Sequence, residues 1–148
     1  FVPIIMGRIV GIDYGRKRIG LAVTDPLKII ATPLTTLNPA EFESFMKKYM
    51  DSETVDCFVI GYPRELDNSP SESVKDLTPF LTRLKRVFPE IPVHKVDERF
   101  TSVIAQKAII EGGVKKEARK EKGLVDKVSA TLILQSYLEN SSVKNRLR

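Results

Sequence analysis

The chain has 148 residues, of which 42% are hydrophobic and 29% charged, a composition typical of a folded globular protein rather than a disordered chain. Its single cysteine, Cys57, excludes an internal disulfide framework and a zinc site built on several thiolates. The net charge of +5 favours a polyanionic partner such as nucleic acid, although many proteins of this charge bind none.

We expect one domain over residues 1–148, with its core at about residues 6–140 and a flexible tail at 141–148. No apolar run approaches the roughly 20 residues of a membrane span. The first six residues lack the basic region and the cleavage site of a signal peptide. These features predict a soluble cytoplasmic protein with no membrane partner.

The first third of the chain predicts three strands. Residues Arg8–Tyr14 and Arg18–Asp25 are rich in β-branched residues, and the short turn between them predicts an antiparallel hairpin. A third strand is predicted over Ile29–Leu37, where Pro33 indicates a sheet edge or a bulge.

Helices and strands alternate in the rest of the chain. Asn38 and Pro39 mark a helix start, and Pro79 predicts a kink or a new helix start capped by Thr78. Helical apolar spacing or short β-branched runs predict, in chain order, a helix containing Phe42, Phe45, Met46, Tyr49 and Met50, a strand over Val55–Gly61, a helix over Val74–Phe88, a strand over Ile91–Val96, and helices over Thr101–Glu111 and Asp126–Glu139.

This order of elements predicts the α/β class. We expect a mixed five-stranded sheet in which the first three strands are antiparallel and the later strands parallel. Helices should cover both faces, because right-handed crossovers join the parallel strands.

Acidic residues lie at the ends of these predicted elements. Asp13 ends the first strand, Asp97 and Glu98 end the last strand, and Asp126 begins the last helix. Because open α/β sheets bind ligands at the carboxyl ends of their strands, we expect these carboxylates to meet at one edge. Such an oxygen-rich cluster suits hard divalent cations. A pair of divalent cations can activate a water molecule and stabilise the leaving oxygen in phosphodiester hydrolysis.

Basic residues flank the acids. They are, in chain order, Arg16, Lys17, Arg18 and Arg99, followed by Lys115, Lys116, Arg119, Lys120 and Lys122 in the run before the last helix. Carboxylates that hold metal, surrounded by cations that hold phosphate, are what metal-dependent cleavage of nucleic acid needs. By charge pattern alone, the run over residues 115–122 is more often a solvated surface than a substrate-binding loop.

Four short motifs occur in order between about Met6 and Asn140. They are Gly11-Ile12-Asp13-Tyr14-Gly15 with Lys17-Arg18-Ile19-Gly20; Gly61-Tyr62-Pro63; Asp97-Glu98-Arg99 with Thr101-Ser102; and Asp126 with Ala130, Leu134 and Gln135. In this combination the chain resembles the YqgF/RuvX family. That family is described as Holliday junction resolvases and as nucleases that process the 5′ end of pre-16S ribosomal RNA.

The resemblance implies a ribonuclease H-like fold and a bacterial cytoplasmic protein. It implies that Asp13, Glu98 and Asp126 form the catalytic and metal-binding set, with Mg²⁺ or Mn²⁺ as cofactor. Together with the basic pattern, it leads us to expect substrate contacts from Arg16, Lys17, Arg18, Arg99, Thr101, Lys116 and Arg119.

The chain departs from the family pattern in two places. Asp67-Asn68 stands where the family loop usually ends in glycine, and Asn is among the residues that tolerate a positive φ. The last helix carries Ser129-Ala130 where the family usually has two alanines.

Several residues have a structural interpretation beside the functional one. Asp13 suits a turn cap, and Asp126 suits a helix N-cap. Strand alternation sends Asp97 and Glu98 to opposite faces, so one of them is expected to face the metal, and the resemblance favours Glu98. Cys57 lies in an apolar strand and is expected in the core rather than as a nucleophile.

Three functions remain in competition at this point. The first is a metal-dependent nuclease, acting on a ribosomal RNA precursor or on branched DNA, as a monomer or a homodimer. The second is an ATPase, because the Gly-Ile-Asp-x-Gly strand also resembles the actin/sugar-kinase superfamily; however, the chain has room for only one of the two domains and lacks a P-loop. The third is a non-catalytic RNA-binding ribosome-assembly factor.

Overall fold

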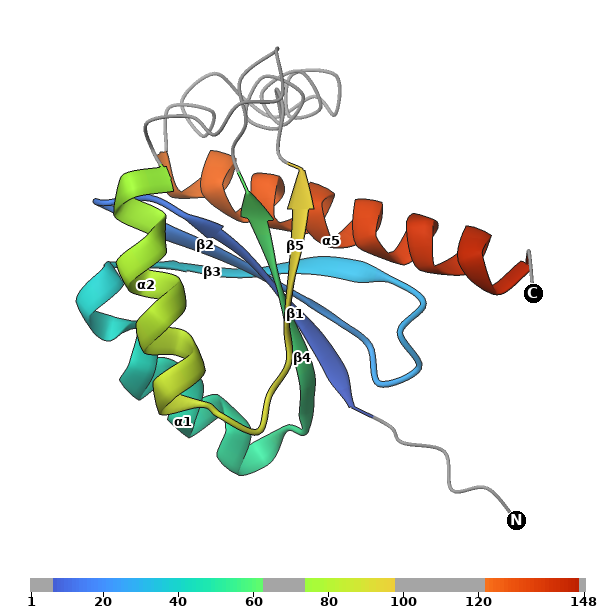
Figure 1. Ribbon diagram of the computed structural model, residues 1–148, viewed down its shortest axis with the longest axis horizontal. Helices are drawn as coiled ribbons and strands as arrows, with labels where there is room; N and C mark the ends of the chain where they lie inside the picture. The colour runs from blue at the N-terminus through green and yellow to red at the C-terminus, as the bar shows by residue number, and fades with distance from the viewer. Residues whose placement is uncertain (1–6, 63–73, 98–121, 147–148) are drawn as a thin grey trace.

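The fold is described by a computed structural model for residues 7–62, 74–97 and 122–146 (Figure 1). The predicted helix over 101–111 and residues 115–121 of the basic run lie outside these residues. The elements are β1 (Arg8–Tyr14), β2 (Ile19–Thr24), β3 (Ala31–Leu37), the 3₁₀ turn η1 (Pro39–Glu41), α1 (Phe42–Ser52), β4 (Val55–Tyr62), α2 (Val74–Val87), β5 (Val93–Asp97) and α5 (Lys122–Arg146).

The five strands form one mixed sheet with the order β3-β2-β1-β4-β5. Strand β2 is antiparallel to both β1 and β3, whereas β4 is parallel to both β1 and β5. The carboxyl ends of β4 and β5 therefore point to one edge of the sheet, where α5 begins (Figure 1). This arrangement confirms the predicted fold class and the predicted hairpin.

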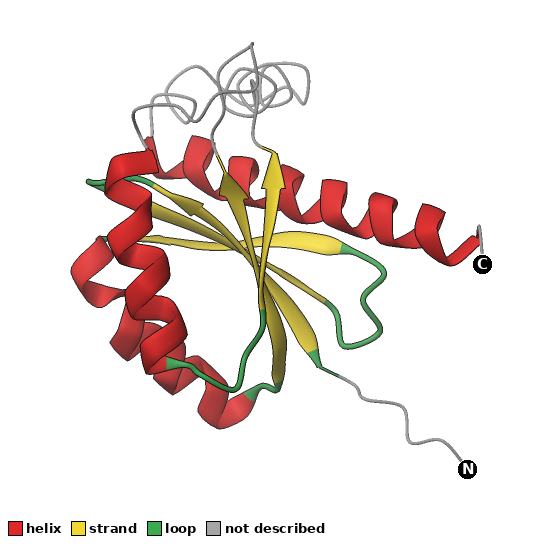
Figure 2. Ribbon diagram, in the orientation of Figure 1, coloured by secondary structure: helices red, strands yellow, loops and turns green. Residues whose placement is uncertain are grey.

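Helices cover the two faces of the sheet unequally (Figure 2). Helices α1 and α2 lie on one face, over a cluster of large buried side chains that includes Phe42, Phe58 and Leu77. Helix α5 crosses the other face, over a cluster that contains smaller residues such as Ala22 and Cys57. The predicted placement of helices on both faces is confirmed.

Small residues let α5 approach the sheet closely. Gly11 of β1 lies where a Cβ atom would be 2.9 Å from the carbonyl oxygen of Ala130 and 3.0 Å from the Cβ of Leu134. Such contacts are tighter than side chains normally make, so glycine is required at this position for the helix to lie where it does. The strand alternation that turns Gly11 toward α5 turns Ile9 and Asp13 to the same face.

Strand β3 is an edge strand with a register shift near Pro33, which confirms the prediction of an edge or a bulge at this residue. The strand begins later than predicted. The β2–β3 register shifts between Leu21 and Ala22, and Pro33 pairs with Ala22 just beyond that shift on an edge strand. The strand begins at Ala31 because the preceding residues close into a loop around Asp25. The Asp25 carboxylate accepts hydrogen bonds from the backbone N–H groups of residues 27, 29 and 30. These bonds, that from Ile30 foremost, lower the pKa of Asp25.

The first two helices agree only in part with the prediction. Asn38 accepts a hydrogen bond from the Ala40 N–H at 3.0 Å, which confirms the cap, although the first turn is a 3₁₀ turn. Helix α2 continues through Pro79 without a new start, so the start predicted at Thr78 is wrong. A proline removes only one N–H donor, and the buried side of α2 holds the helix together across that gap.

The last helix is longer than predicted at both ends. Helix α5 begins at Lys122 and ends at Arg146, so Asp126 lies inside the helix and the predicted helix end at Glu139 is wrong. Asp126 is therefore not the N-cap residue. None of the helices among the described residues is long and apolar enough to cross a membrane.

Cys57 occupies the core of the α5 face, as predicted. Its side chain is buried, and burial raises the pKa of the thiol to about 11, with a further contribution from neighbouring Asp56. Because the thiolate is the reactive form, we predict that the native protein reacts with a disulfide reagent at pH 8 about 100-fold more slowly than an ordinary thiol. The same protein in concentrated urea provides the control, and equal rates for native and unfolded chains would contradict the prediction.

Ser129 carries an isolated hydroxyl inside the same face. The residue is fully buried, and its Oγ has no hydrogen-bond partner among the residues that the structure describes. Leaving such a group without a partner costs about 1–3 kcal/mol. We predict that Ser129→Ala raises the free energy of unfolding by about 1 kcal/mol in urea titrations. The matched change Ala130→Ser, one residue along, should lower it, and a loss of stability in Ser129→Ala would disprove the prediction.

Candidate nuclease site

Asp13 lies near the end of β1, on the face that α5 covers. It pairs with Gly20 in the β1–β2 register, so the acid and the glycine are direct neighbours across the hairpin. The next residue, Tyr14, turns to the opposite face, where its ring stacks on that of Phe80 at 4.6 Å. This stacking fixes the end of β1 against α2 while leaving Asp13 half-buried beneath α5.

Asp126 reaches the same place from α5. A Cβ atom on Gly20 would lie only 2.0 Å from the carbonyl oxygen of Asp126, so the helix backbone lies directly on β2 at this residue. Gly20 is thus in contact with Asp126 on one side and paired with Asp13 on the other. Two acidic residues more than a hundred positions apart thus both lie next to Gly20.

Arg18 forms an ion pair with Asp126. Its Nε donates a hydrogen bond to Asp126 Oδ2 at 2.7 Å, and the side chains are 39% and 20% exposed. Arg18 lies two residues before Gly20, so strand alternation turns both toward α5. The positive charge therefore lies inside the candidate site rather than on its rim.

The other basic residues of the hairpin turn lie further out. Arg16 pairs with Asp76 of α2 at 3.4 Å, and its side chain is 78% exposed. Lys17 is exposed. The pairing with Asp76 could not be predicted from the sequence pattern, because it depends on where α2 packs.

Asp97 ends β5 on the other face of the sheet. Along β5, Val96 packs against the α5 cluster and His94 stacks on Tyr137 of α5. The alternate residue Lys95 turns the other way and lies 4.8 Å from the Tyr62 ring. Alternation places Asp97 on the same side as Lys95, away from the face of Asp13.

Five of the predicted site residues lie outside the described residues: Glu98, Arg99, Thr101, Lys116 and Arg119. Within the described part of the chain, no three His, Cys, Asp or Glu side chains are grouped to hold a metal ion. Asp13 and Asp126 supply two carboxylates at one edge, and oxygen ligands of this kind suit a hard divalent cation. The donor chemistry of these two residues therefore fits the cation that the resemblance implies, and Glu98, which the resemblance adds to them, lies outside the described residues.

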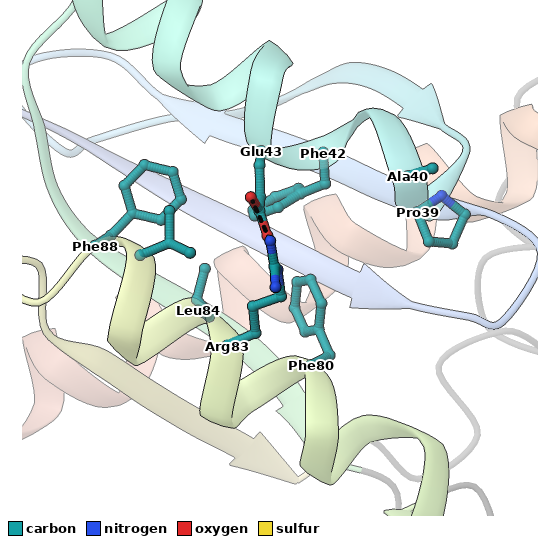
Figure 3. Close-up of a pocket in the computed structure, with 9 residues that line it drawn as sticks. Pro39, Ala40, Phe42, Glu43, Phe80, Arg83, Leu84 and Phe88 are labelled. Atoms are coloured by element: carbon teal, nitrogen blue, oxygen red, sulfur yellow. Dashed lines mark hydrogen bonds and ion pairs between the residues drawn. The ribbon is translucent and has the colours of Figure 1, made fainter.

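A pocket lies on the opposite face of the molecule (Figure 3). It is lined by residues of η1, α1 and α2, has a volume of about 250 Å³, and is spanned by the Glu43–Arg83 ion pair. Phe42, Phe80 and Phe88 surround the pair (Figure 3). The pocket includes neither Asp13 nor Asp126, so it is separate from the acidic edge.

Comparisons with known proteins identify the family of this chain. The sequence model of the family described as "RuvX: Holliday junction resolvase" matches residues 7–140. The chain belongs to the RuvX family. It is therefore a nuclease, and its substrate class is nucleic acid.

Relatives and a solved structure support the assignment. A Parabacteroides distasonis protein named "Putative pre-16S rRNA nuclease" is 52% identical over 91% of this chain and 96% of its own length. A Porphyromonas gingivalis protein of the same name is 53% identical over 91% of this chain and 98% of its own. The fold is similar to that of Thermus thermophilus RuvC in complex with a Holliday junction substrate, with a TM-score of 0.53 and 16% identity over 86% of this chain and 91% of that one. The fold is thus ribonuclease H-like, as expected.

The contact at Gly20 yields a prediction for this RuvX-family protein. Gly20→Ala places a methyl group against helix backbone, which cannot move aside like a side chain, so we expect a loss of about 3 kcal/mol or more in the free energy of unfolding. Gly7→Ala is the matched control, because there the obstructing atoms belong to the Asp56 side chain and can shift. Urea unfolding followed by circular dichroism measures both, and equal losses would show that Gly20 does not set the position of α5.

Proposed function

We propose that this protein is a metal-dependent nuclease in which Asp13, Glu98 and Asp126 form the catalytic carboxylates and hold Mg²⁺ or Mn²⁺. The observation that supports this most strongly is the placement of Asp13 and Asp126 on the two sides of Gly20. When bound, the cation supplies activation of water and stabilisation of the leaving oxygen. The whole chain would work as one nuclease domain in the cytoplasm.

The choice of Glu98 over Asp97 follows from the faces of the sheet. Asp97 lies on the side of Lys95, whereas Asp13 lies on the side of α5. The acid next to Asp97 in sequence is therefore the better partner for Asp13 and Asp126, in agreement with the family motif. Arg16, Lys17, Arg18, Arg99, Thr101, Lys116 and Arg119 would contact the phosphate backbone.

We propose the 5′ end of pre-16S ribosomal RNA as the substrate. Relatives about half identical to this chain over nine-tenths of its length are named for that activity. The description of the family model names a different substrate, the Holliday junction. A junction resolvase would be expected to act as a two-fold dimer that matches its substrate, so gel filtration with and without a synthetic junction separates the two substrates.

The decisive experiment is a cleavage assay on wild type and Asp13→Asn. Both are incubated with Mg²⁺ or Mn²⁺ and either a 5′-extended 16S RNA fragment or a four-way DNA junction. Asp13→Asn keeps the shape of the side chain and removes a metal-binding charge, so we expect the cleavage rate to fall at least about 100-fold.

Asp51→Asn is the matched control for this assay. Asp51 is exposed in the last turn of α1, which runs away from the acidic edge. The Asp51→Asn variant should therefore cleave the substrate at the same rate as wild type. Cleavage of the RNA alone supports the proposed substrate, and cleavage of the junction alone supports a resolvase. Binding without cleavage of either substrate would instead indicate a non-catalytic assembly factor.

A further inference from the structure

The ion pair between Arg18 and Asp126 uses a carboxylate group that the proposed nuclease needs to hold metal. Asp126 Oδ2 accepts the hydrogen bond from Arg18 Nε at 2.7 Å. A divalent cation bound by Asp126 draws on the same carboxylate charge. Two cations that share one carboxylate oppose each other, so binding of a metal ion must weaken the contact with the guanidinium.

The arginine, rather than the aspartate, is the mobile partner in this pair. The Asp126 backbone is fixed by its contact with Gly20, and its side chain is 20% exposed. The Arg18 side chain is longer and 39% exposed, while its neighbour Ile19 is fixed by pairing with Tyr14. A partly exposed pair of this kind contributes little to stability, so breaking it costs little free energy.

A released Arg18 would remain at the acidic edge. Its Cα is held by the hairpin beside Asp13, and the planar guanidinium matches the oxygens of a phosphate group in a bidentate manner. Arg16, by contrast, is paired with Asp76 of α2. Arg18 is therefore the hairpin cation that is paired with an acid of the candidate site.

We propose that Arg18 is a positioning residue that neutralises Asp126 in the metal-free protein and transfers to a phosphate of the nucleic acid when a divalent cation takes that carboxylate. This inference rests on the proposed function of the site. Its consequence is positive coupling between the binding of metal and the binding of nucleic acid. The metal ion releases Arg18 for the phosphate, and the phosphate draws Arg18 away from the Asp126 carboxylate that the metal ion requires.

Metal affinity without nucleic acid provides the first test. Titration of the whole protein with Mn²⁺ by calorimetry should show that Arg18→Gln binds the ion about three- to tenfold more tightly than wild type, because the competing charge is gone. Arg16→Gln removes the same charge from the same turn and should stay within about twofold of wild type at physiological salt. A purely structural ion pair predicts the opposite, an unchanged or weaker affinity in Arg18→Gln.

The second test measures the coupling itself. Binding of a labelled 16S RNA fragment is followed by fluorescence anisotropy in EDTA and in Ca²⁺. Adding Ca²⁺ should raise the RNA affinity of both proteins. We expect this gain in affinity to be smaller in Arg18→Gln than in wild type by a factor of at least about three. Equal gains in the two proteins would overturn the inference.

A measurement on wild type keeps the inference testable if Arg18→Gln does not fold. The Arg18 Nε–H signal in ¹⁵N NMR, identified by its loss in Arg18→Lys, should exchange slowly with solvent in EDTA and faster after Mg²⁺ is added. An unchanged exchange rate at saturating Mg²⁺ would show that Arg18 stays on Asp126.

Failure of this inference differs from failure of the proposed function. If wild type binds Mn²⁺, Asp13→Asn weakens that binding and Arg18→Gln leaves it unchanged, only the role of Arg18 is wrong. If wild type binds no Mn²⁺, or Asp13→Asn binds it equally well, the carboxylate site itself is wrong and the inference falls with it.

Discussion

The contact between Gly20 and the backbone of Asp126 is the constraint on which the site depends. Here α5 lies so close to β2 that a Cβ atom would be 2.0 Å from the helix carbonyl. A short side chain such as aspartate can reach the edge of the strand from a helix only when the helix backbone is this close. The same glycine pairs with Asp13, so one residue fixes the relation between both acids.

Bringing two carboxylates to one edge creates an electrostatic problem that the chain solves locally. Like charges near each other disfavour the ionised state unless a cation compensates them. Arg18 supplies that compensation from the same hairpin that carries Asp13, at 2.7 Å from Asp126. The candidate site thus carries a compensating positive charge of its own, supplied by the strand hairpin.

Much of this arrangement could be predicted from the sequence because it follows from local pattern. Alternation and turn length predict the β1–β2 hairpin, and strand-end position predicts that Asp13 lies at the ligand-binding edge. The start of α5 could not be predicted, because Asp126 is a favourable N-cap residue and its pairing with Arg18, 108 positions away, arises only from tertiary packing. The continuity of α2 through Pro79 also arises from tertiary packing, because burial of the helix against the sheet outweighs the loss of one hydrogen bond.

The two faces of the sheet divide stability from function. Large side chains such as Phe42 and Phe58 fill the α1–α2 face, where a helix is held further from the strands. On the other face, glycine and alanine residues let α5 approach the strands closely, and Asp13 and Asp126 lie on this face. In this sheet β4 separates β1 from β5, so β5 lies about 10 Å from β1. Asp13 and Asp126, by contrast, come from β1 and α5, which pack directly on each other at Gly11.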